Sequence, residues 1–177
     1  MLKEMTVQII ILGIMILILL MIIPFGFGAP FQSSSKKRTN KILKMIKTKK
    51  GSKAVDLGSG TGRLLIALAK NPNISEIHGY EIKPLLVFIS RLRIKKLGLE
   101  KRIFVHSKSF WKADLSKFDV ITSFQISYVM PKLAKKIKLE AKKSVKIISN
   151  TWKFPNWKPT KEDDGVYLYE LKNRKHL

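Results

Sequence analysis

The chain has 177 residues, enough for one domain of ordinary size and a short appendage. Its 35 Lys and Arg residues against 12 Asp and Glu give a net charge of +23. This charge favours an anionic partner such as nucleic acid, a membrane surface or an acidic protein, unless the lysines only solvate the surface. The absence of cysteine excludes disulfides, thiolate zinc sites and a cysteine nucleophile. The three histidines, at positions 78, 106 and 176, show no metal-ligand spacing, so no metal site is expected.

An almost unbroken apolar run occupies the start of the chain. Residues 7–23 contain one polar side chain, Gln8, and are apolar all round. The run is long enough for a membrane span and differs from an amphipathic surface helix. A cleaved signal peptide is disfavoured, because the start is nearly neutral and Pro30 directly follows the nearest small residues.

The flanks of this run predict the domain organisation. Basic residues at 36–38 follow it, whereas only Lys3 precedes it, so the positive-inside bias places the C-terminal part in the cytoplasm. We therefore expect a single-pass transmembrane anchor over residues 1–23, a Gly/Pro/Ser-rich linker over 24–35 and a catalytic domain over 36–177.

Helical and strand periodicities alternate after residue 35. The predicted helices cover 35–47, 63–70, 84–97 and 131–143; the predicted strands cover 53–57, 76–81, 102–106, 118–124, 145–150 and 166–171. In the helix that begins at Pro84, we expect Leu85, Phe88, Ile89 and Leu92 to face the core. The alternation predicts an α/β fold with a doubly wound parallel sheet.

A glycine-rich turn follows the first predicted strand. Residues 55–63 read VDLGSGTGR, with glycines at 58, 60 and 62 that allow a tight turn and close approach to a ligand. A dinucleotide fingerprint would require glycine at 63, where Arg63 stands. Asp56 precedes the first glycine by two residues. Glu81 ends the next strand, about 20 residues after the loop, where an acid can accept ribose hydroxyls.

The acid-x-G-x-G-x-G pattern and the second acid resemble the class I S-adenosylmethionine-dependent methyltransferases. The resemblance implies a Rossmann-like sheet of six to seven strands, the last one antiparallel, and S-adenosyl-L-methionine as cofactor. It assigns cofactor binding to Asp56, Gly58, Ser59, Gly60, Thr61, Gly62, Glu81, Ile82, Ser109 and Phe110. The segment between Trp157 and Val166 leaves little room for a second antiparallel strand.

Further segments are similar to a narrower group, the archaeal broad-specificity protein lysine methyltransferases and their membrane-anchored mitochondrial relatives. These segments lie at 30–34, 109–116, 130–133, 147–149, 157–159 and 166–169. The mitochondrial relatives modify the ATP synthase c-subunit and the adenine nucleotide translocase. The resemblance implies N-methylation of a lysine in a membrane-associated protein, possible without a dedicated base.

Aromatic side chains can line a channel for the lysine ammonium. Phe31, Tyr128 and Trp152 are the expected channel residues, because they lie in predicted loops or strand ends at the cofactor edge. Phe154 is a further candidate, and Phe124 is expected to pack in the core.

Other acceptors stay open as alternatives. A phospholipid N-methyltransferase would also use an anchor and a basic face, an RNA methyltransferase would use the charge, and a degenerate fold could act as a membrane assembly factor. Ser123–Ile126 lacks the Asn/Asp-Pro-Pro-Tyr element of adenine and glutamine amide methyltransferases, which argues against those two acceptors.

Overall fold

The computed structural model describes residues 2–26 and 36–171, with side chains described for 4–16 and 37–171. The chain divides into two compact units, Met1–Phe31 and Gln32–Leu177. The predicted boundaries at 23/24 and 35/36 are not tested by this division, and most of the predicted linker lies outside the described residues.

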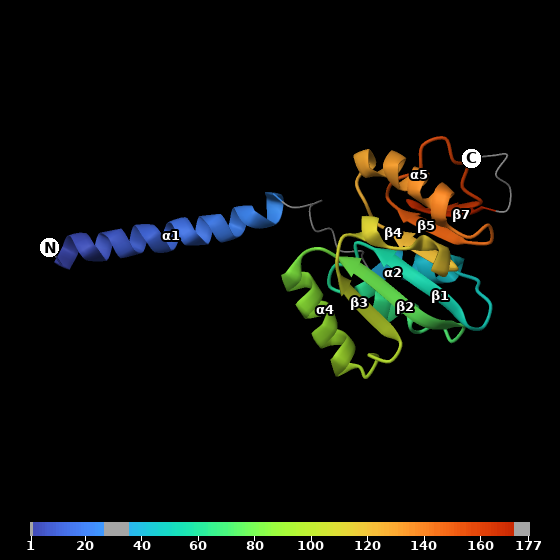
Figure 1. Ribbon diagram of the computed structural model, residues 1–177, viewed down its shortest axis with the longest axis horizontal. Coiled ribbons are helices and arrows are strands. Elements are labelled where there is room, and N and C mark those ends of the chain that lie inside the picture. Colours follow the sequence, from blue (N-terminus) through green and yellow to red (C-terminus); the bar gives the residue numbers. More distant parts are fainter. Residues whose placement is uncertain (1, 27–35, 172–177) are drawn as a thin grey trace. The chain divides into compact units, whose positions relative to one another are not determined.

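Helix α1 forms the first unit and covers Leu2–Gly26 (Figure 1). Within the described part of the chain, we find no helix that is both long and apolar enough to span a bilayer. The expected transmembrane helix over residues 1–23 is therefore unsupported.

Strands and helices alternate along the second unit, as the sequence predicts. The helices are α2 (Lys36–Met45), α3 (Arg63–Leu68), α4 (Pro84–Lys96) and α5 (Met130–Glu140), with short 3-10 helices η1 (Phe110–Lys112), η2 (Leu115–Lys117) and η3 (Ser127–Val129). The strands are β1 (Ser52–Leu57), β2 (Ile74–Glu81), β3 (Ile103–Ser107), β4 (Val120–Ser123), β5 (Lys146–Asn150), β6 (Lys161–Asp163) and β7 (Val166–Glu170).

All seven described strands join one sheet in the order β3-β2-β1-β4-β5-β7-β6. Strands β1 to β5 run parallel, β7 pairs antiparallel with β5, and β6 pairs antiparallel with β7. The predicted Rossmann-like sheet with an antiparallel last strand is confirmed. The strand order reverses between β1 and β4, and in open α/β sheets ligands bind at such a switch point, outside the carboxyl ends of the strands.

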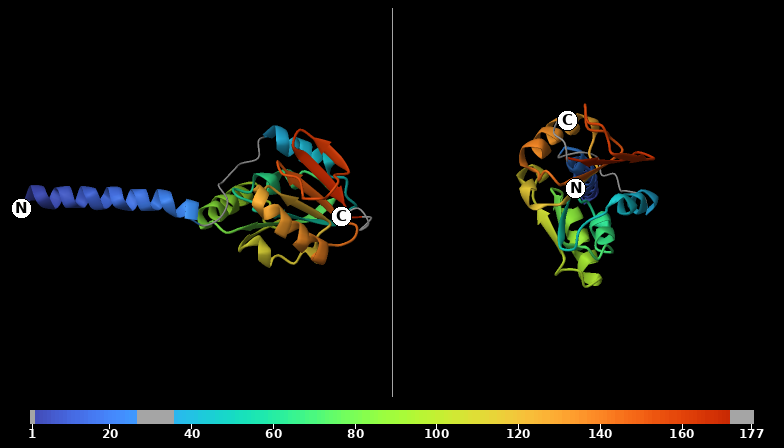
Figure 2. Two further views of the ribbon diagram at one scale, coloured as in Figure 1. Left: turned by 90° about the horizontal axis from the view of Figure 1, so that it is seen from above. Right: turned by 90° about the vertical axis from the view of Figure 1, so that its right-hand side faces the viewer.

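Both faces of the sheet are covered, so the central strands are apolar on both sides (Figure 2). Ala54 and Val55 are neighbours on β1 that point to opposite faces, and both are fully buried. One face packs against α2, α3 and α4, with Ile42, Leu65 and Ile94 in its core. The other face packs against α5, η1 and η2, with Leu133 and Leu115 in its core.

Strand β6 was not expected, because its three residues are exposed and polar and carry no strand pattern. The short segment between Trp157 and Val166 does hold this strand, because the hairpin from β6 to β7 needs only two turn residues. These are Asp164 and Gly165, with φ values of 47° and 76°. This backbone conformation belongs to the tightest hairpins. Lys41 of α2 holds the hairpin, with Nζ 2.6 Å from Oδ1 of Asp163 and 3.2 Å from Oδ2 of Asp164.

The inward face of α4 was predicted wrongly. The helix buries Val87, Ser90 and Ile94, whereas Leu85, Phe88 and Leu92 are exposed. Apolar residues occur all round this helix, so the periodicity of the sequence fits more than one inward face. The prediction chose the face with the larger side chains. The structure selects the other stripe because small Ser90 fits directly against Gly62.

Tyr169 offers a test of the core beneath the β5–β7 pair. Its Oη accepts a hydrogen bond from the buried backbone N of Phe154 (3.2 Å), and burial raises the pKa of Tyr169 to about 12. Tyr169→Phe leaves that N–H unpaired, so we expect the free energy of unfolding in urea to fall by about 1–3 kcal/mol. Tyr167→Phe, on the same strand but only half-buried, is the matched control. Equal losses in both variants would contradict this role of the hydroxyl.

Candidate functional site

A tight loop joins β1 to α3 at the switch point of the sheet. The backbone N–H groups of Gly58 and Ser59 both donate to the carbonyl of Tyr80 on β2, at 2.9 and 3.0 Å. Gly58, Gly60 and Gly62 have φ values of 88°, 54° and 75°, in the left-handed region that favours glycine. The loop thus lies against the carboxyl end of β2, and α3 starts directly after it.

Two of these glycines are also required by their neighbours. A Cβ on Gly58 would lie 2.5 Å from Nε2 of Gln125, and a Cβ on Gly62 would overlap Oγ of Ser90. Gln125 is buried and donates from Nε2 to the carbonyl of Leu57 at 2.7 Å. The loop therefore packs closely between Gln125, in the segment after β4, and Ser90, in the middle of α4.

The carboxylate of Glu81 connects this loop to the next one. Its Oε2 accepts a hydrogen bond from Gly60 N, and its Oε1 accepts from Ile82 N and Lys83 N, each at 2.9 Å. Glu81 is buried, so these bonds replace the water that the carboxylate leaves. Since a carboxylate has about four acceptor positions, one position remains for a ligand.

Asp56 is the second buried acid of the site. Its Oδ1 accepts a hydrogen bond from Oγ1 of Thr122, its partner on β4, at 2.8 Å. Burial is the main cause that raises the pKa of Asp56 to about 7; the Thr122 hydrogen bond opposes this shift, and the nearby charge of Glu81 adds to it. Two carboxyl groups in one buried site attract a cationic ligand.

Two buried hydroxyl groups in the same segments of the described chain lack hydrogen-bond partners. Among the described residues, Oγ of Ser59 and Oγ of Ser123 are buried and have no hydrogen-bond partner. Ser59 belongs to the glycine loop, and Ser123 ends β4. Buried polar atoms of this kind are costly unless a ligand or water pairs with them. Two acids, two hydroxyls and a loop with three glycines fit a ligand that carries an ammonium group and sugar hydroxyls.

The remaining predicted cofactor residues lie along the same edge. Ile82 is exposed just beyond β2, and Oγ1 of Thr61 accepts a hydrogen bond from Arg93 at 2.9 Å. Ser109 caps η1 by accepting from Trp111 N, and the ring of Phe110 lies 4.7 Å from that of Trp111. The structure bonds Glu81 to the glycine loop, places Asp56 near enough to feel its charge, and places Ser109 and Phe110 beyond the end of neighbouring β3.

The predicted channel residues separate into three groups. Tyr128 on η3 and Trp152 after β5 are exposed at the carboxyl edge, and their role in a channel stays a prediction. Phe31 lies outside the described residues. Phe154 belongs to the core, with its ring 4.7 Å from that of Trp157, so its predicted role in the channel is wrong. Phe124 is half-buried and appears in neither described core cluster.

Sequence reasoning missed three residues that shape the site, namely Thr122, Gln125 and Ser90. Thr122 donates a hydrogen bond to Asp56, and Gln125 packs against Gly58. Each pair is separated by almost 70 residues in the sequence. Only the strand order, which puts β4 beside β1, gives a signal for them. Ser90 carried a weaker signal, since it is the one small residue among bulky ones in the sequence of α4.

Comparison with known proteins agrees with this geometry. Residues 56–161 match the model of the ANTKMT methyltransferase domain. The chain belongs to this family. The match begins at Asp56 and includes the glycine loop, Glu81 and the β4–α5 segment, and it confirms the resemblance predicted from the motifs.

Two relatives of the domain are named lysine methyltransferases. The chain is 32% identical over 146 residues to the lysine N-methyltransferase of the ATP synthase c-subunit from Xenopus laevis, covering 80% of this chain and 63% of that protein. It is 28% identical over 154 residues to a protein-lysine N-methyltransferase of Saccharolobus islandicus, covering 82% and 96%. The chain therefore spans less than two thirds of the Xenopus protein.

A solved structure shares the fold of the methyltransferase domain. It is an RNA methyltransferase from Salinibacter ruber in complex with S-adenosyl-L-homocysteine. The TM-score is 0.72 at 24% identity, over 78% of this chain and 91% of that one.

The buried acid makes a prediction about stability. The pKa of Asp56 is about 7 in the folded chain, above its ordinary value of 3.8, so its contribution to stability is fully present below about pH 4. That contribution is lost as the pH rises through 7, because the folded state then buries a charge. Asp56→Asn removes the charge and keeps an acceptor for Thr122.

We therefore expect Asp56→Asn to melt at a higher temperature than the unaltered protein at pH 8, with the difference shrinking as the pH falls from 7 to 4. Each kcal/mol corresponds to roughly 2–4 °C in a chain of this size. Differential scanning calorimetry over this pH range measures the effect. A pH-independent difference, or a lower melting temperature at pH 8, would show that Asp56 is not held as a buried acid.

Proposed function

We propose that this chain transfers a methyl group from S-adenosyl-L-methionine to the side-chain nitrogen of a lysine in a membrane-associated protein. The observation that carries the proposal is the pair of buried acids, Asp56 on β1 and Glu81 on β2, which flank the glycine loop in a chain of this methyltransferase family. The lysine acceptor is supported by relatives named lysine N-methyltransferases, one of them for the ATP synthase c-subunit. A small membrane protein of that kind is the proposed substrate, and nucleic acid is the less favoured one.

S-Adenosyl-L-methionine would supply the methyl group of its sulfonium: the lysine amine would form a bond to the methyl carbon while the carbon–sulfur bond breaks, and S-adenosyl-L-homocysteine would leave. Asp56 would hold the ammonium of the methionine part, because its carboxylate is buried at the start of the loop. That ammonium would keep Asp56 ionised at neutral pH. Ser59 and Ser123, whose hydroxyls lack partners among the described residues, would hydrogen-bond the same part.

Glu81 would bind the ribose, but its present hydrogen bonds limit how it does so. Three backbone N–H groups leave one acceptor position on the carboxylate. Binding both ribose hydroxyls therefore requires the release of at least one N–H group. Gly60 is the suitable donor to release, since it lies in the loop that contacts the cofactor.

The lysine must lose a proton before it attacks. At pH 7 this costs about 4.6 kcal/mol from an ordinary pKa of ~10.4. Desolvation beside Tyr128 and Trp152 would reduce this cost, and their ring faces would hold the ammonium and its methylated forms. Water can take the proton, so no side chain of the domain has to act as a base.

We further propose that the apolar run at residues 7–23 tethers the domain to a membrane, with the domain on the cytoplasmic side. The support is the length and composition of the run and the basic residues that follow it. A tether raises the effective concentration of membrane-bound substrates around the site. Extraction of membranes with alkaline carbonate tests this: the full chain stays in the pellet if the tether spans the bilayer.

Methyl transfer is tested by incubating the full chain with tritiated S-adenosyl-L-methionine and membranes of its source, then separating protein, lipid and RNA. We expect acid-stable label in a small membrane protein. Asp56→Asn and Glu81→Gln should lower the labelling rate roughly tenfold to a hundredfold, because each removes a charge-assisted bond to the cofactor. Glu76→Gln, on the same strand as Glu81 but paired with Lys53 at the surface, is the matched control and should keep the rate. Label confined to lipid or RNA would refute the lysine acceptor.

The aromatic channel has a separate test. We expect Tyr128→Ala and Trp152→Ala to raise KM for the protein substrate about threefold to thirtyfold, the range of a cation–π contact. The Kd for S-adenosyl-L-methionine, measured by calorimetry, should stay unchanged. Leu139→Ala, a position on α5 as exposed as Tyr128, is the control for surface truncation. A change in cofactor affinity of similar size would place these residues at the cofactor instead.

A further inference from the structure

Helix α4 presents a row of large apolar side chains to solvent. Leu85, Phe88 and Leu92 are 68%, 60% and 51% exposed, although Val87, Ser90 and Ile94 on the opposite side are buried. At 100° per residue the three exposed side chains share one face, directly opposite the buried one. Ile82, just before the helix, is also exposed and extends the row toward the cofactor site. We call Ile82, Leu85, Phe88 and Leu92 the α4 stripe.

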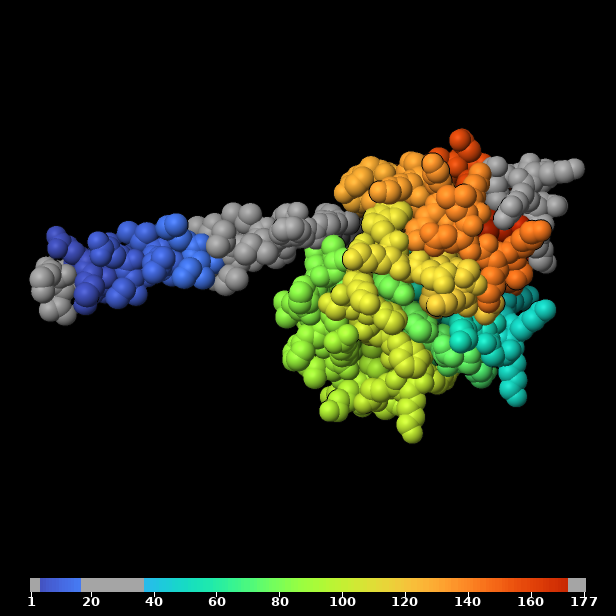
Figure 3. Space-filling view, in the orientation of Figure 1, coloured from blue at the N-terminus to red at the C-terminus, as the bar shows by residue number. Residues whose placement is uncertain are grey.

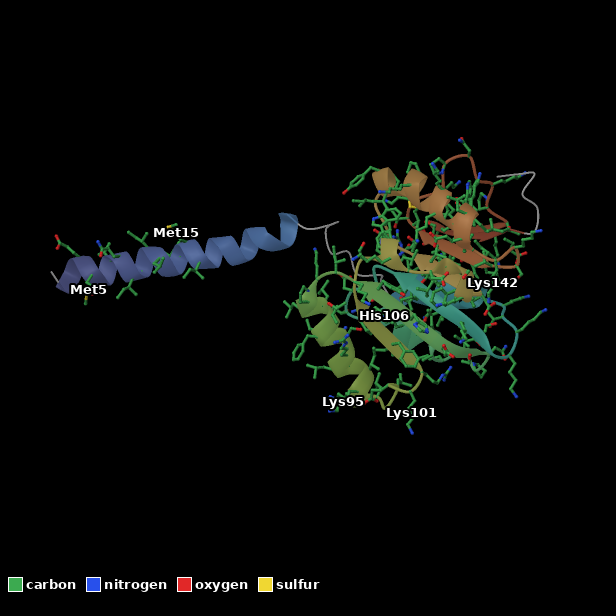
Figure 4. All side chains as sticks on the ribbon, in the orientation of Figure 1. Met5, Met15, Lys95, Lys101, His106 and Lys142 are labelled. Carbon is green, nitrogen blue, oxygen red and sulfur yellow. The ribbon has the colours of Figure 1, made fainter. Side chains whose placement is uncertain are left out.

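Basic residues border the α4 stripe on both sides. Arg91 and Lys95 lie on one flank, Arg93 on the other, and Lys96 follows at the C-terminal end. The helix contains no acidic residue. In Figure 4, Lys95 and Lys101 lie toward the C-terminal end of α4 and the turn after it. An apolar stripe between long basic side chains is the pattern of helices that lie in a membrane interface.

The two arginines on the flanks are held in place by the domain. Arg91 donates to the carbonyl of Val105 at 2.8 Å, and Arg93 donates to Oγ1 of Thr61 at 2.9 Å. Both guanidinium groups are exposed yet fixed beside the stripe. Their order reduces the entropy lost when they meet an anionic group.

The charge and size of the α4 stripe argue against a second copy of the chain, or another protein, as its partner. A symmetric dimer through α4 would place Arg91, Arg93, Lys95 and Lys96 against their own copies, which costs free energy by like-charge repulsion. A stable protein interface also needs ~20–30 residues on each side, whereas the stripe has four apolar side chains on one convex helix. The space-filling view shows α4 as a flank of the domain (Figure 3).

We propose that the α4 stripe docks on an anionic lipid surface, with the helix lying in the headgroup region. The net charge of +23 supplies the complementary field. Roughly 5–10 Å of penetration is enough for Leu85, Phe88 and Leu92 to reach the acyl boundary. This contact is separate from the tether at residues 7–23 and rests on the geometry of α4 alone.

The chain has no cysteine, so single labels can be placed at will. Phe88→Cys in the full-length protein carries an environment-sensitive fluorophore, and Leu139→Cys on α5, at a position 74% exposed, carries the same label as the matched control. Both are mixed with phosphatidylcholine vesicles with or without phosphatidylglycerol. A second vesicle set contains lipids with a nitroxide near the acyl boundary.

On anionic vesicles, we expect a blue shift and at least twofold nitroxide quenching at position 88 but not at position 139. Lys95→Glu together with Lys96→Glu should lower the quenched fraction at position 88, since each basic residue strengthens such binding roughly fivefold. The readout involves no methyl transfer, so it is independent of the proposed lysine specificity.

Three outcomes would overturn the proposal. Position 88 could stay solvent-like on anionic vesicles or respond no more than position 139. Its shift could follow protein concentration without vesicles, which would indicate a second copy of the chain. Its shift could require a membrane protein in the vesicles, which would indicate docking on that protein.

Discussion

The carboxylate of Glu81 is the constraint on which the site depends. It accepts backbone hydrogen bonds from Gly60 in the β1–α3 loop and from Ile82 and Lys83 at the start of α4. One buried anion therefore sets the distance between two loops that the chain forms 20 residues apart. Because a buried charge is costly unless it is hydrogen-bonded, movement of either loop away from Glu81 requires a replacement donor, such as a ribose hydroxyl for Gly60 N. The left-handed backbone at Gly60 and the start of α4 at Pro84 are compatible with this set of bonds.

Asp56, unlike Glu81, is buried without enough hydrogen-bond donors to stabilise its charge. Its carboxyl group has one hydroxyl donor, Thr122, which does not offset its burial, and its pKa therefore rises. Burial favours the protonated acid, and a bound cation would favour the ionised one. Cofactor binding and ionisation of Asp56 are thereby coupled, and the same coupling links them to Glu81, whose charge acts on Asp56. A domain without this acid would be more stable but would lose its selectivity for a cationic ligand.

Local patterns predicted most of the fold but little of the contact network. The run of small residues at 58–62 and the alternating elements identify the sheet and its switch point, because backbone conformation there depends on residues close in sequence. Thr122 and Gln125 escaped notice because their partners become neighbours only when β4 pairs with β1. The three-residue strand β6 has no periodicity to recognise. The face of α4 was misjudged because hydrophobicity alone cannot show which of two apolar stripes has a small residue opposite Gly62.

Helix α4 connects the glycine loop of the site to the exposed α4 stripe. Ser90 packs inward on Gly62, so the position of α4 is set by the glycine loop, and the α4 stripe is then directed outward as a consequence. In a βαβ unit the helix runs back along the sheet, so its first turn lies at the carboxyl edge, beside the loop. A lipid surface that holds Leu85 and Phe88 would therefore hold the rim of the site at headgroup depth. The acceptor lysine would then have to lie close to the bilayer surface. Acceptor selection would then follow from where the domain sits as well as from the shape of its channel.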